Sequence, residues 1–134
     1  MVVGTDIPDV TQRPSEETSV SENNLVVLRG TLVADPRLRE LPSGSILSQF
    51  DVTTRDDTGT QSVPVAWFEP PKSGVPAVAG DDVVVIGSVR RRFFRVGGAT
   101  QSRTEVIAEQ VIPARRSRQV DRTLGAVRAL LGEG

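Results

Sequence analysis

The stretch VVVIGSVRRRFFRV, residues 83–96, joins a run of β-branched residues to a cluster of arginines and phenylalanines. Its density of Val, Ile and Phe, with no helical period, predicts an extended strand. Because side chains alternate between the two faces of a strand, Arg90, Arg92 and Phe94 share one face. Such a face offers charge for phosphates and a ring for bases, as in proteins that bind single-stranded nucleic acid. The alternative is that the phenylalanines belong to the core and the arginines to a solvated edge.

The rest of the chain predicts four more strands, which makes the fold class all-β. These stretches are residues 25–33, 46–55, 61–68 and 100–112. Gly30 and Gly87 lie inside strands, where glycine marks a bulge or a bend. Asp56-Asp57-Thr58-Gly59 has the composition of a hairpin turn, and the prolines between residues 70 and 80 argue against a long helix there. Five strands with hairpin connections predict a five-stranded oligonucleotide/oligosaccharide-binding (OB) barrel.

The two ends of the chain differ in composition from the predicted barrel domain, residues 24–113. Residues 1–23 hold one Arg and five acidic residues among Pro, Ser and Thr, which predicts a disordered acidic leader. Residues 114–134 begin as a basic linker and continue as a short C-terminal helix, with Asp121 or Thr123 as its expected cap. Helical spacing places four apolar residues in one stripe: Val120, Leu124, Val127 and Leu131. A helix this short needs a surface to lie on, which is the barrel or a sister subunit, or alternatively a recruited partner.

The charge of the chain is unevenly distributed. The whole sequence has 134 residues and a formal net charge of −1, which argues against a nucleic-acid binder. Residues 1–23 nevertheless carry a net charge of −4 and residues 24–120 a net charge of +3, while residues 83–101 hold four arginines and no acid. Because the distribution of charge decides whether a surface attracts phosphate, the acidic total excludes little.

Several kinds of chemistry are excluded by composition. The chain has no Cys and no His, which removes disulfides, Cys/His zinc sites, thiol nucleophiles and Ser-His-Asp triads. The paired carboxylates Asp56-Asp57 and Asp81-Asp82 fall in turns, where Asp is favoured for local hydrogen bonds. We therefore expect no enzymatic activity, no metal and no cofactor. No signal peptide or bilayer-length apolar stretch is evident, so we expect a cytoplasmic protein that does not enter a membrane.

The third predicted strand carries two large aromatic side chains on opposite faces. Trp67 alternates with Val63 and Val65, which predicts that it belongs to the barrel core. Phe68 falls on the other face after Pro64 and Ala66, and an exposed Phe between small residues is a suitable platform for a base. The alternative for Phe68 is that it covers the end of the barrel.

With its strands placed, the sequence resembles the bacterial single-stranded DNA-binding proteins over residues 24–112. The resemblance is carried by the order and spacing of several short motifs. They are NLVVLRG (24–30), DPRLR (35–39), PSG (42–44), FDVTTR (50–55), VAWF (65–68), GSVRRRFF (87–94) and RTEV (103–106).

The resemblance implies an OB-fold that binds single-stranded DNA without sequence preference, in replication, recombination or repair, associated with the nucleoid. It also implies a homotetramer, a state that an open edge of the strand at residues 25–33 would favour. Residue by residue, it implies basic contacts and stacking positions at Arg39, Arg55, Phe68, Arg90, Arg92 and Phe94.

The sequence also departs from the family pattern. Two positions where the family often stacks Trp are non-aromatic, near Thr58 and at Ser62, which predicts weaker binding or a shorter site. Residues 70–80 replace the usual helix between the third and fourth strands. We expect a secondary paralogue without the acidic, Phe-ended tail, and so no recruitment of repair partners by that route. The alternative function is an OB-fold protein-interaction subunit of a replication or primosome assembly, with weak affinity for DNA.

Overall fold

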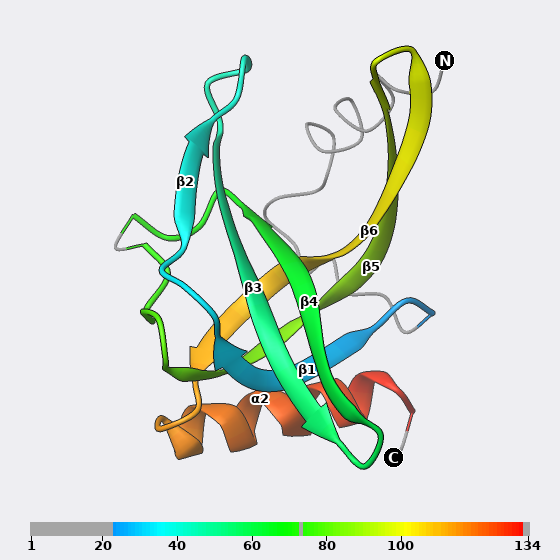
Figure 1. Ribbon diagram of the computed structural model, residues 1–134. Coiled ribbons are helices and arrows are strands. Elements are labelled where there is room, and N and C mark those ends of the chain that lie inside the picture. The colour runs from blue at the N-terminus through cyan, green and yellow to red at the C-terminus, as the bar shows by residue number, and fades with distance from the viewer. Residues whose placement is uncertain (1–22, 73, 133–134) are drawn as a thin grey trace.

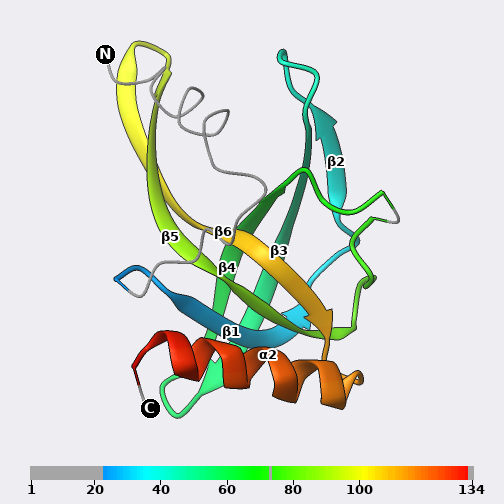
Figure 2. The ribbon, with the colours of Figure 1, turned by 180° about the vertical axis from the view of Figure 1, so that it is seen from behind.

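The computed structural model describes residues 23–72 and 74–132, which form a barrel of strands with a helix lying against its outside (Figures 1 and 2). The elements are β1 (Val26–Leu32), β2 (Arg37–Glu40), β3 (Ile46–Asp56), β4 (Gly59–Phe68), β5 (Asp82–Val96), β6 (Ala99–Pro113) and α2 (Ser117–Leu130). The predicted acidic leader lies, apart from its last residue, outside the described residues.

Five strands close the barrel. The sheet runs in the order β1-β5-β6-β4-β3-β2, and β1 also pairs with β3, which joins the two ends of the five-stranded part. Strands β4 and β6 are parallel, with Val65 beside Val106, and all other pairs are antiparallel. The predicted five-stranded OB barrel with a C-terminal helix is therefore confirmed. Residues 70–72 and 74–80 form no helix, as their prolines predict.

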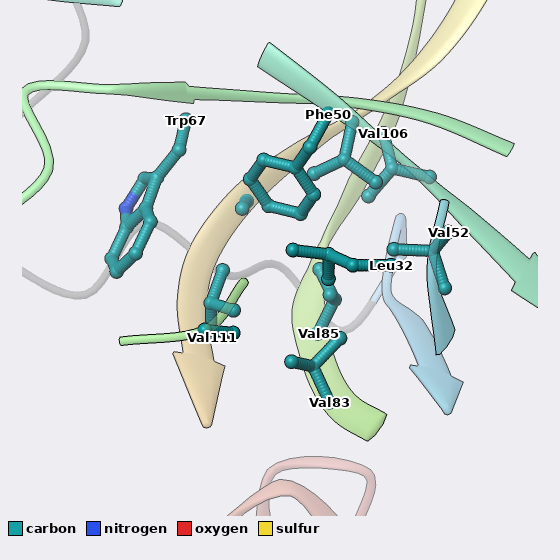
Figure 3. Packing of buried hydrophobic residues seen from close by; sticks show 11 residues of the cluster. Leu32, Phe50, Val52, Trp67, Val83, Val85, Val106 and Val111 are labelled. Carbon is teal, nitrogen blue, oxygen red and sulfur yellow. The ribbon is translucent and has the colours of Figure 1, made fainter. Parts of the chain in front are cut away.

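The core is built by the alternating residues of the barrel strands. Side chains from the strands and from the loop before β5 form one buried cluster: Leu32, Phe50, Val52, Val65, Trp67, Ala77, Val83, Val85, Val106, Ala108 and Val111. Figure 3 shows most of these side chains converging between the strands. Trp67 is 8% exposed and lies in this cluster, so the prediction that it is a core residue is confirmed.

Two glycines allow strands to approach one another closely. A side chain at Gly30 would fall onto the carbonyl oxygen of Thr53, where β1 crosses β3. A side chain at Gly87 would fall onto the carbonyl oxygen of Ile107, and the register of β5 and β6 shifts between Ile86 and Gly87. Both glycines therefore act as the sequence predicts: they let long strands bend around a small barrel.

Helix α2 docks on the outside of the barrel, as its apolar stripe predicts. Val120 is buried against Val84, Ile86 and Ile112, and Leu124 and Val127 pack against the same cluster. Two details of the prediction are wrong. Leu131 lies beyond the end of the helix and is half exposed, and Arg116 takes the N-cap position, so that Asp121 and Thr123 lie inside the helix. The helix begins earlier because the chain turns directly after β6, with the Arg116 N–H bonded to the Pro113 carbonyl.

Strand β2 was not predicted from the sequence. Its four residues are all exposed and, among the described strands, pair with β3 alone, so they show no apolar alternation. The predicted open edge of β1 is wrong at Thr31 and Leu32, where β3 pairs with β1 to close the barrel. Between Val26 and Gly30, β1 pairs with β5 alone among the described strands.

No helix among residues 23–72 and 74–132 has the length and apolar character that a bilayer crossing requires.

Candidate nucleic-acid interface

The cross-strand register places Arg39 and Phe68 on one face of the molecule. Residues that lie directly opposite in neighbouring antiparallel strands project to the same side of the sheet. Arg39 of β2 lies opposite Leu47 of β3, and Leu47 lies opposite Phe68 of β4. Trp67, the neighbour of Phe68, points into the core, so this shared side is the outside of the barrel. We call it the outer face.

The outer face is continuous across the sheet as far as β5. One row of opposed residues crosses all the strands from β2 to β5: Arg37, Gln49, Ala66, Ile107 and Ser88. Arg90, Arg92 and Phe94 follow Ser88 at every second position of β5 and so extend the outer face. The sequence-predicted residues at Arg39, Phe68, Arg90, Arg92 and Phe94 therefore belong to one surface.

Phe68 is less accessible than the sequence predicts. Its ring is half-buried, and it packs against an outer cluster formed by Leu47, Ala66 and Ile107, with Leu41 beside it. The expected picture of an exposed ring between small residues is therefore wrong, because neighbouring strands supply larger apolar side chains than β4 itself does. Phe68 forms part of this apolar cluster on the outer face, where a base can still cover the exposed part of its ring.

Beyond the barrel, β5 and β6 continue as a two-stranded arm. Residues 89–96 of β5 pair with residues 99–106 of β6, and Gly97 and Gly98, both with positive φ, form the turn. Figures 1 and 2 show this arm projecting from the barrel on the same side as the hairpin of β2 and β3. The outer face of the arm carries eight residues: Arg90, Arg92, Phe94, Val96, Ala99, Gln101, Arg103 and Glu105.

Arg92 and Phe94 form a stacked pair on the arm. The guanidinium carbon of Arg92 lies 5.8 Å from the centre of the Phe94 ring, within the range of a cation–π contact. Both side chains are partly exposed. The pair therefore places a positive charge and a ring side by side, where a nucleotide presents its phosphate and its base.

A buried carboxylate lies beneath these arginines. The side chain of Glu105 is only 4% exposed, and its Oε2 lies 3.3 Å from Nε of Arg92. The Nε–H of Arg92 is not aligned for a hydrogen bond, so the contact is an ion pair and not a directed bond. The Oε1 of Glu105 lies 3.8 Å from Nε of Arg103, and Arg90 lies directly opposite Glu105 in the ladder. Glu105 thus holds two arginines and neutralises part of their charge.

Glu105 and Arg103 were not predicted as site residues. The RTEV motif that contains them belongs to the family resemblance, yet its place in the site depends on the register of β6 against β5. That register contains the irregularity at Gly87, which no alternation within a single strand reveals. The useful signal in the sequence is a charged pair at i, i+2 in the part of β6 that belongs to the arm, residues 99–106, which carries no other charge.

Arg55 lies apart from the other predicted residues. It lies opposite Thr60, next to the turn between β3 and β4, about 26 Å along the strand from Leu47. In this turn Thr58 donates its hydroxyl (2.6 Å) and its N–H (2.8 Å) to Oδ1 of Asp56. Both bonds hold the pKa of the Asp56 carboxyl below its usual range, and the bond from the Thr58 hydroxyl has the larger effect. Arg55 has the same parity as Leu47 and extends the outer face only at its far end.

No protein-family model and no curated protein matches this chain. The strand order and the closed barrel define the class of the protein as an OB barrel, here with a basic and aromatic outer face. An OB barrel supports several functions, so the function must be argued from the site.

Proposed function

We propose that this chain binds single-stranded DNA without sequence preference and without catalysis, on the outer face from Phe68 to the arm. The observation that carries the proposal is the stacked Arg92–Phe94 pair, which lies on the same face as Arg90 and Arg103. Stacking on aromatic rings and a basic path for the backbone are the two features that sequence-tolerant binding of single strands requires.

The geometry favours single strands over duplexes. A ring stacks only with a base whose face is uncovered, and in a duplex both faces of each base are covered by its neighbours. Phe68 and Phe94 therefore contribute nothing to duplex binding, which leaves only charge. In OB barrels, nucleic acid lies across the two central strands of the sheet and between two loops. The β2–β3 hairpin and the β5–β6 arm are the corresponding extensions here.

The wider role follows from the resemblance to the bacterial single-stranded DNA-binding proteins. On that basis we propose that the protein protects single strands during DNA replication, recombination or repair, in the cytoplasm and at the nucleoid. We also propose a homotetramer. The part of β1 between Val26 and Gly30, which β3 leaves uncovered, is the edge available for pairing with a second subunit.

The test is the affinity for labelled oligo-dT, measured by fluorescence anisotropy over a series of salt concentrations. We expect log affinity to fall with log salt by about 0.7 for each phosphate that is neutralised. A duplex of the same length serves as the control and is expected to bind much more weakly. Absence of binding to oligo-dT at low salt would contradict the proposal.

A second candidate function is that of an OB-fold interaction subunit in a replication or primosome assembly. The observation that favours it is Glu105, because a carboxylate beneath Arg92 and Arg103 weakens the attraction of that face for phosphate. Under this alternative, oligo-dT binds only weakly, and its affinity is lost at physiological salt. The salt series therefore distinguishes the two candidates.

A further inference from the structure

The arm has a second face that the proposed site does not use. We call it the inner face of the arm. Beyond Val89, which lies opposite the core residue Val106, it is formed by alternate residues of β5 and the residues opposite them in β6: Arg91, Phe93, Arg95, Thr100, Ser102 and Thr104. In the barrel, the same side of β5 carries Val83 and Val85, which are buried in the core. Past Val89 the strand leaves the barrel, so this side becomes exposed.

Along β5, the inner face carries an aromatic and basic set of side chains, and not the small polar residues expected of a strand that only contacts water. Phe93 is 38% exposed and lies between Arg91 and Arg95 on this side of β5. The guanidinium carbon of Arg91 lies 5.8 Å from the centre of the Phe93 ring. This is the same arrangement that Arg92 and Phe94 make on the outer face, so the arm carries one stacked arginine–phenylalanine pair on each side.

The two faces differ in charge. The outer face of the arm contains Glu105, which is paired with Arg92 and Arg103. The inner face has no carboxylate among its residues: opposite Arg91, Phe93 and Arg95 lie only Thr104, Ser102 and Thr100. Arg95 donates one bond to the carbonyl of Gly98 at 2.8 Å, which fixes the guanidinium near the tip of the arm. The inner face thus presents two arginines with no acid in its own ladder.

We infer that the inner face of the arm is a second contact surface for single-stranded nucleic acid, with Phe93 stacking a base and Arg91 and Arg95 binding the adjacent phosphates. This inference rests on the proposed function. A strand that covers the outer face reaches the inner face by passing around the arm. The outer face continues across the barrel to Phe68, whereas the inner face ends where the core begins, so a short strand makes more contacts on the outer face and a longer strand occupies both.

The test uses the full chain and two lengths of oligo-dT. One is about 8 nucleotides, within the roughly 4–16 that one OB barrel covers, and the other is about 35. Phe93→Ala is expected to leave the affinity for the short oligonucleotide unchanged and to weaken binding of the long one by at least about fivefold, the loss of one stacked base. Phe94→Ala, on the outer face, is expected to weaken binding of both lengths.

Two further variants identify what the ring recognises. Phe93→Tyr keeps the aromatic ring and is expected to bind the long oligonucleotide like the wild type, whereas Phe93→Leu keeps apolar bulk and is expected to bind like Phe93→Ala. Thermal melts accompany each variant. Equal affinities of Phe93→Ala and wild type for both lengths would overturn the inference and leave the proposed function intact.

A third outcome would assign the inner face to protein contacts. If Phe93→Ala lowers the mass measured by light scattering, and Phe93→Leu restores it, the face binds a second copy of the chain and the inference is wrong. If wild type binds neither oligonucleotide, the proposed function fails, and the inference fails with it. Val33→Ala, which changes an apolar side chain that is 57% exposed and lies outside the arm, is the matched control for loss of surface hydrophobicity.

Discussion

Replacing Glu105 by Gln tests whether the buried carboxylate limits the affinity of the outer face. Gln has the same shape and keeps one carbonyl oxygen, but it removes the negative charge that now lies 3.3 Å from Nε of Arg92. We expect Glu105→Gln to bind single-stranded DNA more tightly than wild type, because a phosphate on Arg92 no longer faces a second anion beneath it.

The size of the effect follows from the geometry. A phosphate bound to the outer side of Arg92 lies about 6 Å from the Glu105 carboxylate, and their repulsion is about 0.7 kcal/mol in water and about 3 kcal/mol at an effective dielectric constant of 20. Glu105 is 4% exposed and Arg92 is 33% exposed, so the medium lies between these limits. We therefore expect a gain of about 1–2 kcal/mol, which lowers Kd about 5- to 30-fold.

The salt dependence gives a second measurement of the same effect. In wild type, Glu105 neutralises part of the positive charge of Arg92 and Arg103. If its loss lets one more phosphate be neutralised, the slope of log affinity against log salt becomes steeper by about 0.7. The variant is also expected to lose about 1–3 kcal/mol of folding stability, because a partly buried charged contact is replaced by a neutral one.

Asp57→Asn is the matched control. It changes the net charge of the chain by the same amount, but it lies in the turn between β3 and β4, far from the arm. Charges further apart than about 8–10 Å are largely screened at physiological salt, so this variant is expected to bind like wild type. If Glu105→Gln shows unchanged or weaker affinity in anisotropy titrations, the carboxylate does not compete with phosphate and the reasoning is refuted.

Four other predictions follow from the fold and the site. Phe94→Ala is expected to weaken DNA binding by about 1–3 kcal/mol without a change in melting temperature, whereas Trp67→Ala is expected to lose about 3–5 kcal/mol of folding stability; thermal melts beside binding curves show whether the two roles are reversed. Gly87→Ala is expected to destabilise the protein by about 1–3 kcal/mol, because the new Cβ meets the Ile107 backbone, and an unchanged melting curve would contradict this. Helix α2 is expected to be protected in hydrogen exchange, and rapid exchange there would mean that it is not docked on Ile86 and Ile112. Deleting residues 1–22 is expected to leave the fold intact and to raise DNA affinity slightly at low salt, since it removes a net negative charge, and equal affinities at low salt would exclude this.

The positions of the barrel strands were predictable because their signal lies within each strand. Alternation along β4 identifies the side that is buried, and it places Trp67 in the core correctly. Gly30 and Gly87 identify the two points of close approach. Strand β2 has no such signal, because it lies outside the closed ring and buries none of its residues.

The parts of the site that were missed depend on contacts between strands. The partner of a residue in a ladder is set by turns, bulges and the parallel pairing of β4 with β6, and none of these is encoded in a single strand. Phe68 is half-buried because Leu47 and Ile107 come from neighbouring strands. Glu105 lies beneath Arg92 because the ladder brings the RTEV motif opposite the arginines. The side of the strand on which a residue lies can therefore be predicted from the sequence. Its neighbours on that side come from other strands, and they can be known only from the register.

The unequal charge of the two sides of the arm has a consequence for how the protein selects its ligand. The outer face carries its own carboxylate at Glu105, and this lowers its affinity for any short strand or isolated phosphate. The inner face has no acid in its ladder, but it is the smaller of the two surfaces, so on our inference it adds its contacts to a strand that already lies on the outer face. Binding energy that is divided in this way rises with the length of the strand, because a second contact made by a strand that is already bound costs far less entropy than the first. The proposed arrangement therefore favours long single strands over short ones without reading any base.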